Sequence, residues 1–257
     1  MTLTDTQLLA WVQQFVWPLI RISALFMIAP VLGARAVSPR IRLLLALLIT
    51  VVVAPLLPAP PVTALLSADW FSTLLQQLLI GLVAGFVLLL VFEAVVMGGE
   101  LIAFGMGLGF AQLADPLRGA STPVIGQFLT VMATLLFLAL GGHLILIEMI
   151  VRSFATLPVG SAGLGIDQMG TLLRFAGIVF SGGLQLALPL VIALLTVNLA
   201  MGVVSRSAPT LNLFAVGFPV TLVAGLMLIR AGLPALQEGI VQLLDEAWVL
   251  LGALLRL

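Results

Sequence analysis

Two acidic residues, Glu93 and Glu100, lie in an otherwise apolar part of the sequence. They are seven residues apart, which is two turns of an α-helix, so they share one face if a helix continues that far. Carboxylates at membrane depth are usually functional, and such a residue could couple ion movement to the transport of a small solute. The alternative is that both acids only cap the interfacial end of the preceding helix.

The scarcity of other reactive side chains excludes several classes of protein. The chain has no cysteine, no lysine and a single histidine, His143, which we expect to lie at a helix end rather than in a proton relay. Zinc sites built from His and Cys are therefore impossible, as are a Walker A loop and an amine nucleophile. The net charge is zero and there is no basic patch for nucleic acid. We expect no enzyme, no metal site and no cofactor, and any driving energy must come from elsewhere.

A glycine-rich segment follows Glu93, with the sequence GGELIAFGMGLGFAQLADPLRGASTPVIG over residues 98–126. Each glycine costs up to about 1 kcal/mol against alanine in a helix, so we expect an irregular loop here. Apolar backbone that is not helical is tolerated at membrane depth only inside protein or beside a cavity. Bulky side chains alternate with glycines in it and could seal an opening by excluding water: Gly105, Met106, Gly107, Leu108, Gly109 and Phe110. The alternative is a close-packed pair of glycine-rich helices.

The elements that must position these residues are long apolar segments. Hydrophobic residues make up 62% of the 257 residues and charged residues 8%, against about 25% charged in soluble domains. Stretches of about 18 to 25 apolar residues are long enough to cross a bilayer as helices. Six such segments lie near residues 8–32, 43–57, 70–92, 119–147, 175–205 and 207–229. We therefore predict an all-α integral membrane protein of long helical hairpins broken by proline and glycine.

Several local signals refine this prediction. Arg21 and Pro18 interrupt the first segment, and the arginines that follow it favour a cytoplasmic loop. Residues 205–209 predict a tight hairpin turn, with Pro209 opening the next helix and Arg206 at the tip. Residues 237–257 predict an amphipathic tail helix that docks on protein. Small residues recur every four positions in Gly81/Gly85 and in Gly217/Thr221/Gly225, which favours close helix packing within the chain or with a partner.

Three blocks of the sequence resemble the FliR family of flagellar export-gate proteins. The blocks are LGARAVSPRIRLLLALLIT, GGELIAFGMGLGFAQLADP and LALPLVIALLTVNLAMGVVSRSAPTLNLFAVGFP, and the likeness spans nearly the whole chain. The third block matches most strongly, at Asn198, Gly202, Arg206, Pro209, Asn212, Phe214, Gly217 and Pro219. Thr210 departs from the family pattern, where glutamine is expected.

The resemblance implies a multi-pass subunit of the bacterial inner membrane and flagellar basal body, part of the type III export gate for unfolded flagellar proteins. Its implied partners are FliP and FliQ in a helical complex, FlhB and FlhA, and membrane lipid. It implies a plug formed by residues 105–110 with Asp115 and Pro116, and subunit contacts at Glu100, Arg206, Asn212, Gly217 and Pro219. Partner subunits would then cover apolar surface that hydropathy assigns to lipid.

We predict one export-gate domain over residues 1–257, with N-terminal helices and plug loop (1–123), helical hairpins (124–230) and a C-terminal amphipathic helix (231–257). The alternative function is a small-solute secondary transporter that uses Glu93 or Glu100. An intramembrane hydrolase is disfavoured, because no two aspartates are placed to share a proton and only one histidine is present.

Overall fold

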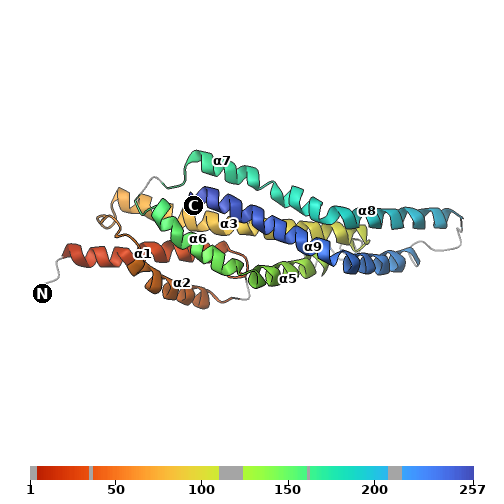
Figure 1. Ribbon diagram of the computed structural model, residues 1–257, viewed down its shortest axis with the longest axis horizontal. Coiled ribbons are helices and arrows are strands. Elements are labelled where there is room, and N and C mark those ends of the chain that lie inside the picture. Colours follow the sequence, from red (N-terminus) through yellow and green to blue (C-terminus); the bar gives the residue numbers. More distant parts are fainter. Residues whose placement is uncertain (1–4, 35–36, 110–123, 161–162, 208–215) are drawn as a thin grey trace. The chain divides into compact units, whose positions relative to one another are not determined.

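The computed structural model describes residues 5–34, 37–109, 124–160, 163–207 and 216–257. In these residues the regular structure is entirely helical (Figure 1). The helices are α1 (Asp5–Ile28), α2 (Pro39–Val53), a 3₁₀ turn (Ala54–Leu56), α3 (Ala68–Gly105), α5 (Val124–Ala139), α6 (Gly142–Thr156), α7 (Ile166–Phe175), α8 (Ile178–Ser207) and α9 (Phe218–Leu255).

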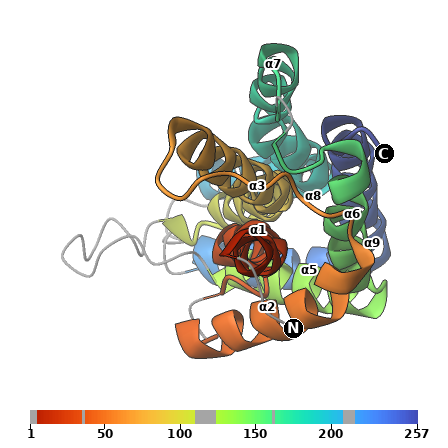
Figure 2. The same ribbon diagram turned by 90° about the vertical axis from the view of Figure 1, so that its left-hand side faces the viewer.

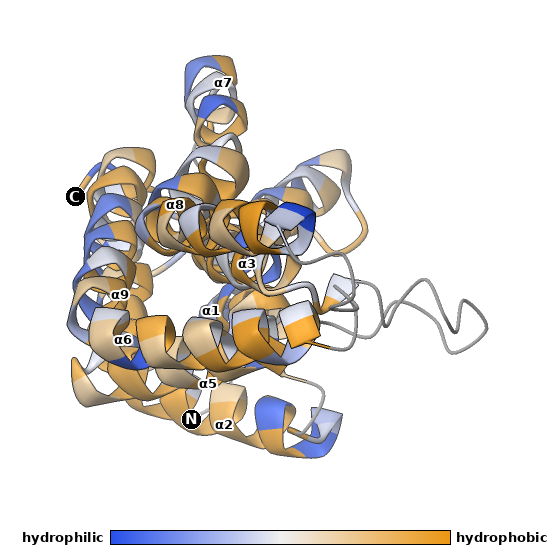
Figure 3. Ribbon diagram, turned by 90° about the vertical axis from the view of Figure 1, so that its right-hand side faces the viewer, coloured by the Kyte–Doolittle hydropathy of each residue, from blue (hydrophilic) through white to orange (hydrophobic). Residues whose placement is uncertain are grey.

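The prediction of an all-α membrane protein with about six apolar segments is confirmed. Among the described residues, five helical stretches are long and apolar enough to cross a membrane, or up to six if the bent pair α5 and α6 counts as one span. Hydrophobic residues predominate along most helices, while hydrophilic residues gather on α7 and along part of α9 (Figure 3).

Helix α2 illustrates how the local sequence sets helix ends. The Ser38 side chain accepts a hydrogen bond from the backbone N–H of Ile41, and Pro39 occupies the first turn, where its missing N–H costs nothing. The helix ends at Val53 and passes into the 3₁₀ turn that contains Pro55. The predicted end near Leu57, caused by the prolines that follow, is therefore confirmed.

The first part of the glycine-rich segment differs from the expected irregular loop, because α3 continues as a helix to Gly105. The physical reason is close packing at two of its glycines. A Cβ added to Gly98 would lie 3.0 Å from the carbonyl oxygen of Gly183, and one added to Gly99 would lie 2.4 Å from the Cα of Gly126. Close approach of neighbouring backbones offsets the cost of glycine in a helix, which agrees with the alternative of tightly packed helices.

Three other helix boundaries differ from the prediction. The segment expected over 119–147 is interrupted at Gly141, which has the left-handed φ of 69° that glycine accepts readily. Helix α8 continues through Ser207, so Ser205–Ser207 are helical rather than part of a tight turn. Helix α9 begins at Phe218, so Pro219 lies in its first turn and breaks no backbone hydrogen bond. Pro209 lies outside the described residues.

The C-terminal helix is amphipathic, as predicted. Its acidic positions Glu238, Asp245 and Glu246 are exposed, while Leu251 and Leu255 are buried. The backbone has no break at residue 231, because α9 is continuous from Phe218 to Leu255. The division of the chain into functional parts stays a prediction.

The chain divides into two compact units. The first contains residues 1–90, 137–176 and 246–257, and the second contains 91–136 and 177–245. In the first unit, α1 lies beside α2, the beginning of α3 and α6 (Figure 2). In the second unit, the end of α3 packs against α8 and α9.

Candidate functional site

The predicted plug residues begin at the C-terminal turn of α3, in the second unit. There the N–H of Leu108 donates to the carbonyl oxygen of Ala103 at 3.0 Å, and the N–H of Gly107 donates to that of Phe104 at 3.0 Å. These two bonds, with a φ of 80° at Gly107, form the Schellman motif that commonly ends helices. Gly107 is therefore the residue that ends α3.

Side chains from α8 and α9 cap the carbonyl groups at this helix end. The side-chain amide of Asn198, on α8, donates to the carbonyl oxygen of Gly105 at 3.0 Å. The hydroxyl of Thr221, on α9, lies 3.4 Å from the carbonyl oxygen of Met106 and 3.0 Å from that of Phe218. The last carbonyls of a helix have no partner inside that helix, so these contacts fix where the turn lies.

Met106 is only 1% exposed, and its side chain occupies a notch on α9 at Gly225. A Cβ added to Gly225 would lie 2.5 Å from the Cγ of Met106, so only glycine leaves enough room. On α8, Leu194 lies against Gly105 in the same way, with 3.1 Å between an added Cβ and its Cδ1. Residues 105–108, which we call the α3 end turn, are thus held by two helices of the second unit.

The resemblance to the family implies a plug formed by residues 105–110 with Asp115 and Pro116. The structure places Gly105 to Gly109 in and just after the α3 end turn, where Leu108 and Gly109 are half-buried. In this conformation the Met106 side chain is buried against Gly225 of α9. Phe110, Asp115 and Pro116 lie outside the described residues, so the plug as a whole stays a prediction.

Glu93 and Glu100 are both on α3, and the helix is continuous between them, so their spacing does place them on one side. Glu93 is exposed and Glu100 is half-buried. Neither forms an ion pair with another described residue. A subunit contact at Glu100 is not tested by these observations.

The other predicted interface residues lie on α8 and around the start of α9. Arg206 is exposed in the last turn of α8, where a cation also interacts favourably with the helix dipole. Gly217 is buried just before α9, and Pro219 is exposed in its first turn. Asn212 lies outside the described residues.

The first unit contains a buried cation that was not predicted from the sequence. Arg21, on α1, is fully buried, and its guanidinium donates from Nε to Oε1 of Gln77 and from one terminal nitrogen to Oγ of Ser153, each at 2.8 Å. The other terminal nitrogen donates to the carbonyl oxygen of Leu157 at 2.9 Å. The Phe154 ring stacks on the guanidinium, with its centroid 3.8 Å from Cζ.

This Arg21 cluster joins α1, α3 and α6 without an acidic residue among its described partners. A buried arginine is stable only when its donors are satisfied, and here three neutral acceptors and an aromatic face serve that purpose. The available signal was a lone arginine inside a long apolar segment, which predicts an inward-facing side chain.

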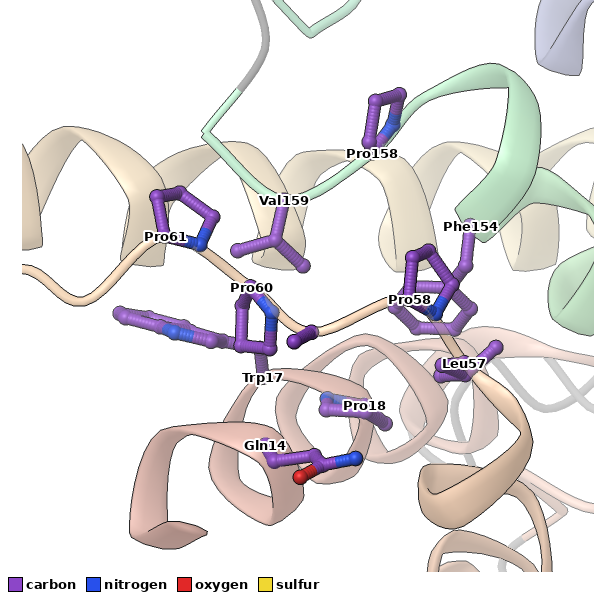
Figure 4. A pocket seen from close by; sticks show the side chains of 11 residues that line it. Gln14, Trp17, Pro18, Leu57, Pro58, Pro60, Pro61, Phe154, Pro158 and Val159 are labelled. Carbon is purple, nitrogen blue, oxygen red and sulfur yellow. The ribbon is translucent and has the colours of Figure 1, made fainter. Parts of the chain in front are cut away.

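A cavity of about 100 Å³ lies beside this cluster (Figure 4). The loop after α2 contributes Pro58, Pro60 and Pro61 to its lining, and α1 contributes Trp17 and Pro18. Gln13 holds this loop, because its side-chain amide donates to the carbonyl oxygen of Thr63 at 2.6 Å and accepts from the N–H of Thr63 at 3.1 Å. The prolines and aromatic rings give the cavity an apolar lining that offers no catalytic group.

Within the described ranges, no three His, Asp or Glu residues are placed to hold a metal ion. The features that these residues do show are capped helix ends, close glycine contacts and apolar side chains. The fold and these features define an all-helical, multi-pass membrane protein.

Comparison with known proteins identifies the family. Residues 12–247 match the model of the bacterial export proteins, family 1. The chain is 41% identical to the flagellar biosynthetic protein FliR of Pectobacterium carotovorum subsp. carotovorum over 255 residues, covering 99% of this chain and 97% of the relative. It is 41% identical to FliR of Escherichia coli (strain K12) over 249 residues, covering 96% and 95%, respectively. It is 31% identical to FliR of Bacillus subtilis (strain 168) over 218 residues, covering 84% of each.

The chain belongs to the FliR family of flagellar biosynthetic proteins. It is a component of the flagellar export apparatus. The resemblance found in the three sequence blocks is therefore confirmed over nearly the whole chain.

Proposed function

We propose that this chain forms part of the channel through which unfolded flagellar proteins leave the cell, and that the segment beginning at the α3 end turn closes that channel. Family membership supports a role in export. The observation that carries the closing role is the α3 end turn itself, where a long apolar helix stops at a glycine with positive φ and a run of alternating glycines and bulky residues begins.

The chemistry of this segment suits a seal. Leu108 and Phe110 have no charge and exclude water, while Gly107 and Gly109 give the backbone freedom to move. A hydrophobic constriction blocks ions by dewetting, yet it offers little resistance to an unfolded chain that can displace it. Asp115 and Pro116 complete the segment in sequence.

We further propose FliP and FliQ as the partners in a helical gate complex in the inner membrane, with FlhB and FlhA associated with it. The extensive apolar surface supports this assembly. Leu43, Leu44, Leu47 and Leu48 on α2 are each 46–60% exposed, so this face needs lipid or a partner to cover it. Glu100, Arg206, Asn212, Gly217 and Pro219 are the proposed subunit contacts. No catalytic role is part of this proposal, and Glu93 and Glu100 give the small-solute transporter no specific support.

The test is ion leakage through the assembled gate. Replacing Phe110 with alanine removes bulk from the proposed seal and should raise the conductance of membranes that contain the complete complex, while secretion continues. Phe180→Ala, on an exposed position of α8, is the matched control and should leave conductance unchanged. Equal conductance of Phe110→Ala and the unmodified complex, at equal amounts of assembled complex, would rule out the sealing role.

A further inference from the structure

We propose that the α3 end turn, residues 105–108, is a latch that is docked on α8 and α9 while the gate is closed and is released from both when the gate opens. The rest of α3 stays packed on α8 during this step. This inference rests on the proposed function, and it assigns to Asn198, Leu194 and Gly225 the role of positioning residues for the closing segment.

The contacts of the turn are of a kind that can be broken and remade. One neutral hydrogen bond, from Asn198 to the carbonyl oxygen of Gly105, joins it to α8, and the Asn198 side chain is exposed. Two contacts join the turn to α9: the flexible, apolar Met106 side chain fills the notch at Gly225, and the Thr221 hydroxyl lies 3.4 Å from the carbonyl oxygen of Met106. Methionine is unbranched and adapts to irregular spaces, so it can leave and re-enter such a notch.

The body of α3 is held differently within the same unit. Gly98 faces the carbonyl oxygen of Gly183, and Gly99 faces the backbone of Gly126. These are contacts of backbone with backbone, in which no side chain can rotate away, so separation there requires moving whole helices. We therefore expect the part of α3 up to Gly99 to stay packed and the turn from Gly105 onward to be released. Gly107, with its positive φ, gives this turn backbone freedom.

Cysteine pairs can lock each part separately, because the chain has no native cysteine. A Cβ at position 105 would lie 3.5 Å from the Cβ of Leu194, and one at position 98 would lie 3.4 Å from the Cβ of Leu186. Both values are close to the spacing of about 3.5 to 4.5 Å found in disulfides. The pair G105C with L194C locks the α3 end turn, and the pair G98C with L186C is the matched control on the body of the same two helices.

The experiment measures flagellar protein secretion by cells that carry each pair in the complete complex, before oxidation, after oxidation and after reduction. We expect oxidation to lower secretion at least tenfold for the pair at 105 and 194, and reductant to restore it. Secretion with the pair at 98 and 186 should match that of the reduced pair at 105 and 194 in all three states, at equal amounts of assembled complex. Each variant is compared with itself in the reduced state. A folding defect lowers secretion in both states, whereas a locked turn lowers it only after oxidation.

Two results would overturn the proposal that the α3 end turn is a latch. Undiminished secretion with the disulfide at 105 and 194 fully formed would show that the turn need not leave α8. Equal inhibition by both disulfides would show that the whole of α3 moves. Either result leaves the proposed function standing, whereas normal secretion by cells that lack the chain would refute that function itself.

A second variant tests the contact with α9. Gly225→Ala should expel Met106 from its notch and raise ion leakage through the resting complex severalfold. Gly232→Ala is the control on the same helix, because its nearest neighbour is the end of the Leu190 side chain at 3.2 Å, which can shift. Forming the disulfide at 105 and 194 should suppress the leak of Gly225→Ala. A resting conductance unchanged by Gly225→Ala, in an intact complex, would exclude Met106 from the latch.

Discussion

Helix α3 contributes one part to each of the two units, and the two parts are held by different kinds of contact. In the first unit, Gln77 accepts a hydrogen bond from the fully buried Arg21, and Gly81 lies against the backbone of α1. In the second unit, the α3 end turn is held by hydrogen bonds from Asn198 and Thr221 and by the packing of Met106 at Gly225. The first region buries a charge, whereas the second buries only neutral groups.

The difference indicates which region can change conformation. A hydrogen bond to a charged group contributes about 1.5 to 3 kcal/mol, and Arg21 makes three of them. A neutral hydrogen bond contributes about 0.5 to 1.5 kcal/mol, and burying a methionine about 1.5 to 3 kcal/mol. Releasing the α3 end turn breaks two neutral hydrogen bonds and one methionine contact, which costs less than breaking the three charged hydrogen bonds of the Arg21 cluster, so we expect the first unit to act as a rigid support.

The largest loss of stability should come from Arg21→Ala. This change removes the guanidinium from three buried acceptors and from the face of Phe154, and it leaves a cavity. We expect a loss of about 3 to 5 kcal/mol in the free energy of unfolding, measured by thermal unfolding in detergent and by the yield of assembled complex.

Arg152→Ala is the matched control for this change. Arg152 pairs with Glu148 at 2.6 Å on an exposed helix surface, so its loss should cost less than about 1 kcal/mol. Similar losses for the two arginine variants would contradict the distinction between a buried support and a solvated pair.

A smaller but clear effect is expected from Gly81→Ala. An added Cβ would lie 2.2 Å from the carbonyl oxygen of Arg21 and 2.8 Å from the Cβ of Ala24, so α1 and α3 must move apart. Such overpacking costs about 1 to 3 kcal/mol, and we expect a lower unfolding temperature and less assembled complex. Gly202→Ala, where no heavy atom lies within 4 Å, should show neither defect. If both variants behave alike, the close approach of α1 and α3 is unimportant for stability.

The smallest effect should come from Gly107→Ala in the α3 end turn. The left-handed backbone at φ 80° costs a residue with a side chain about 1 to 2 kcal/mol, and the nearest atom, in Phe218, lies at 3.4 Å and leaves space for a methyl group. We expect nearly normal assembly but altered secretion rates and resting conductance. Gly107→Asn should be milder, because asparagine tolerates this conformation better. An assembly defect as large as that of Arg21→Ala would show that the turn is a structural support rather than a movable element.

Part of this molecule followed directly from its sequence. The scarcity of charge and the length of the apolar segments determined an all-α membrane protein, because only helices that satisfy their own backbone can cross lipid singly. The prolines after Ala54 placed the C-terminal end of α2, because proline lacks the N–H that a helix interior needs, whereas the helix begins at Pro39 rather than near the expected residue 43. Three blocks of residues identified the family.

The tertiary structure alone decided the details of both regions of α3. Residues 98–105 are helical although helix propensity disfavours their glycines, because propensity measures an isolated helix, whereas here close contact with other helices offsets the cost. The direction of the Met106 side chain depends on Gly225, which lies more than one hundred residues further along the chain. The partners of Arg21 likewise come from two distant segments, α3 at Gln77 and the end of α6 at Ser153 and Leu157. Spacing along a helix specifies which face a residue occupies, and only packing specifies what that face meets.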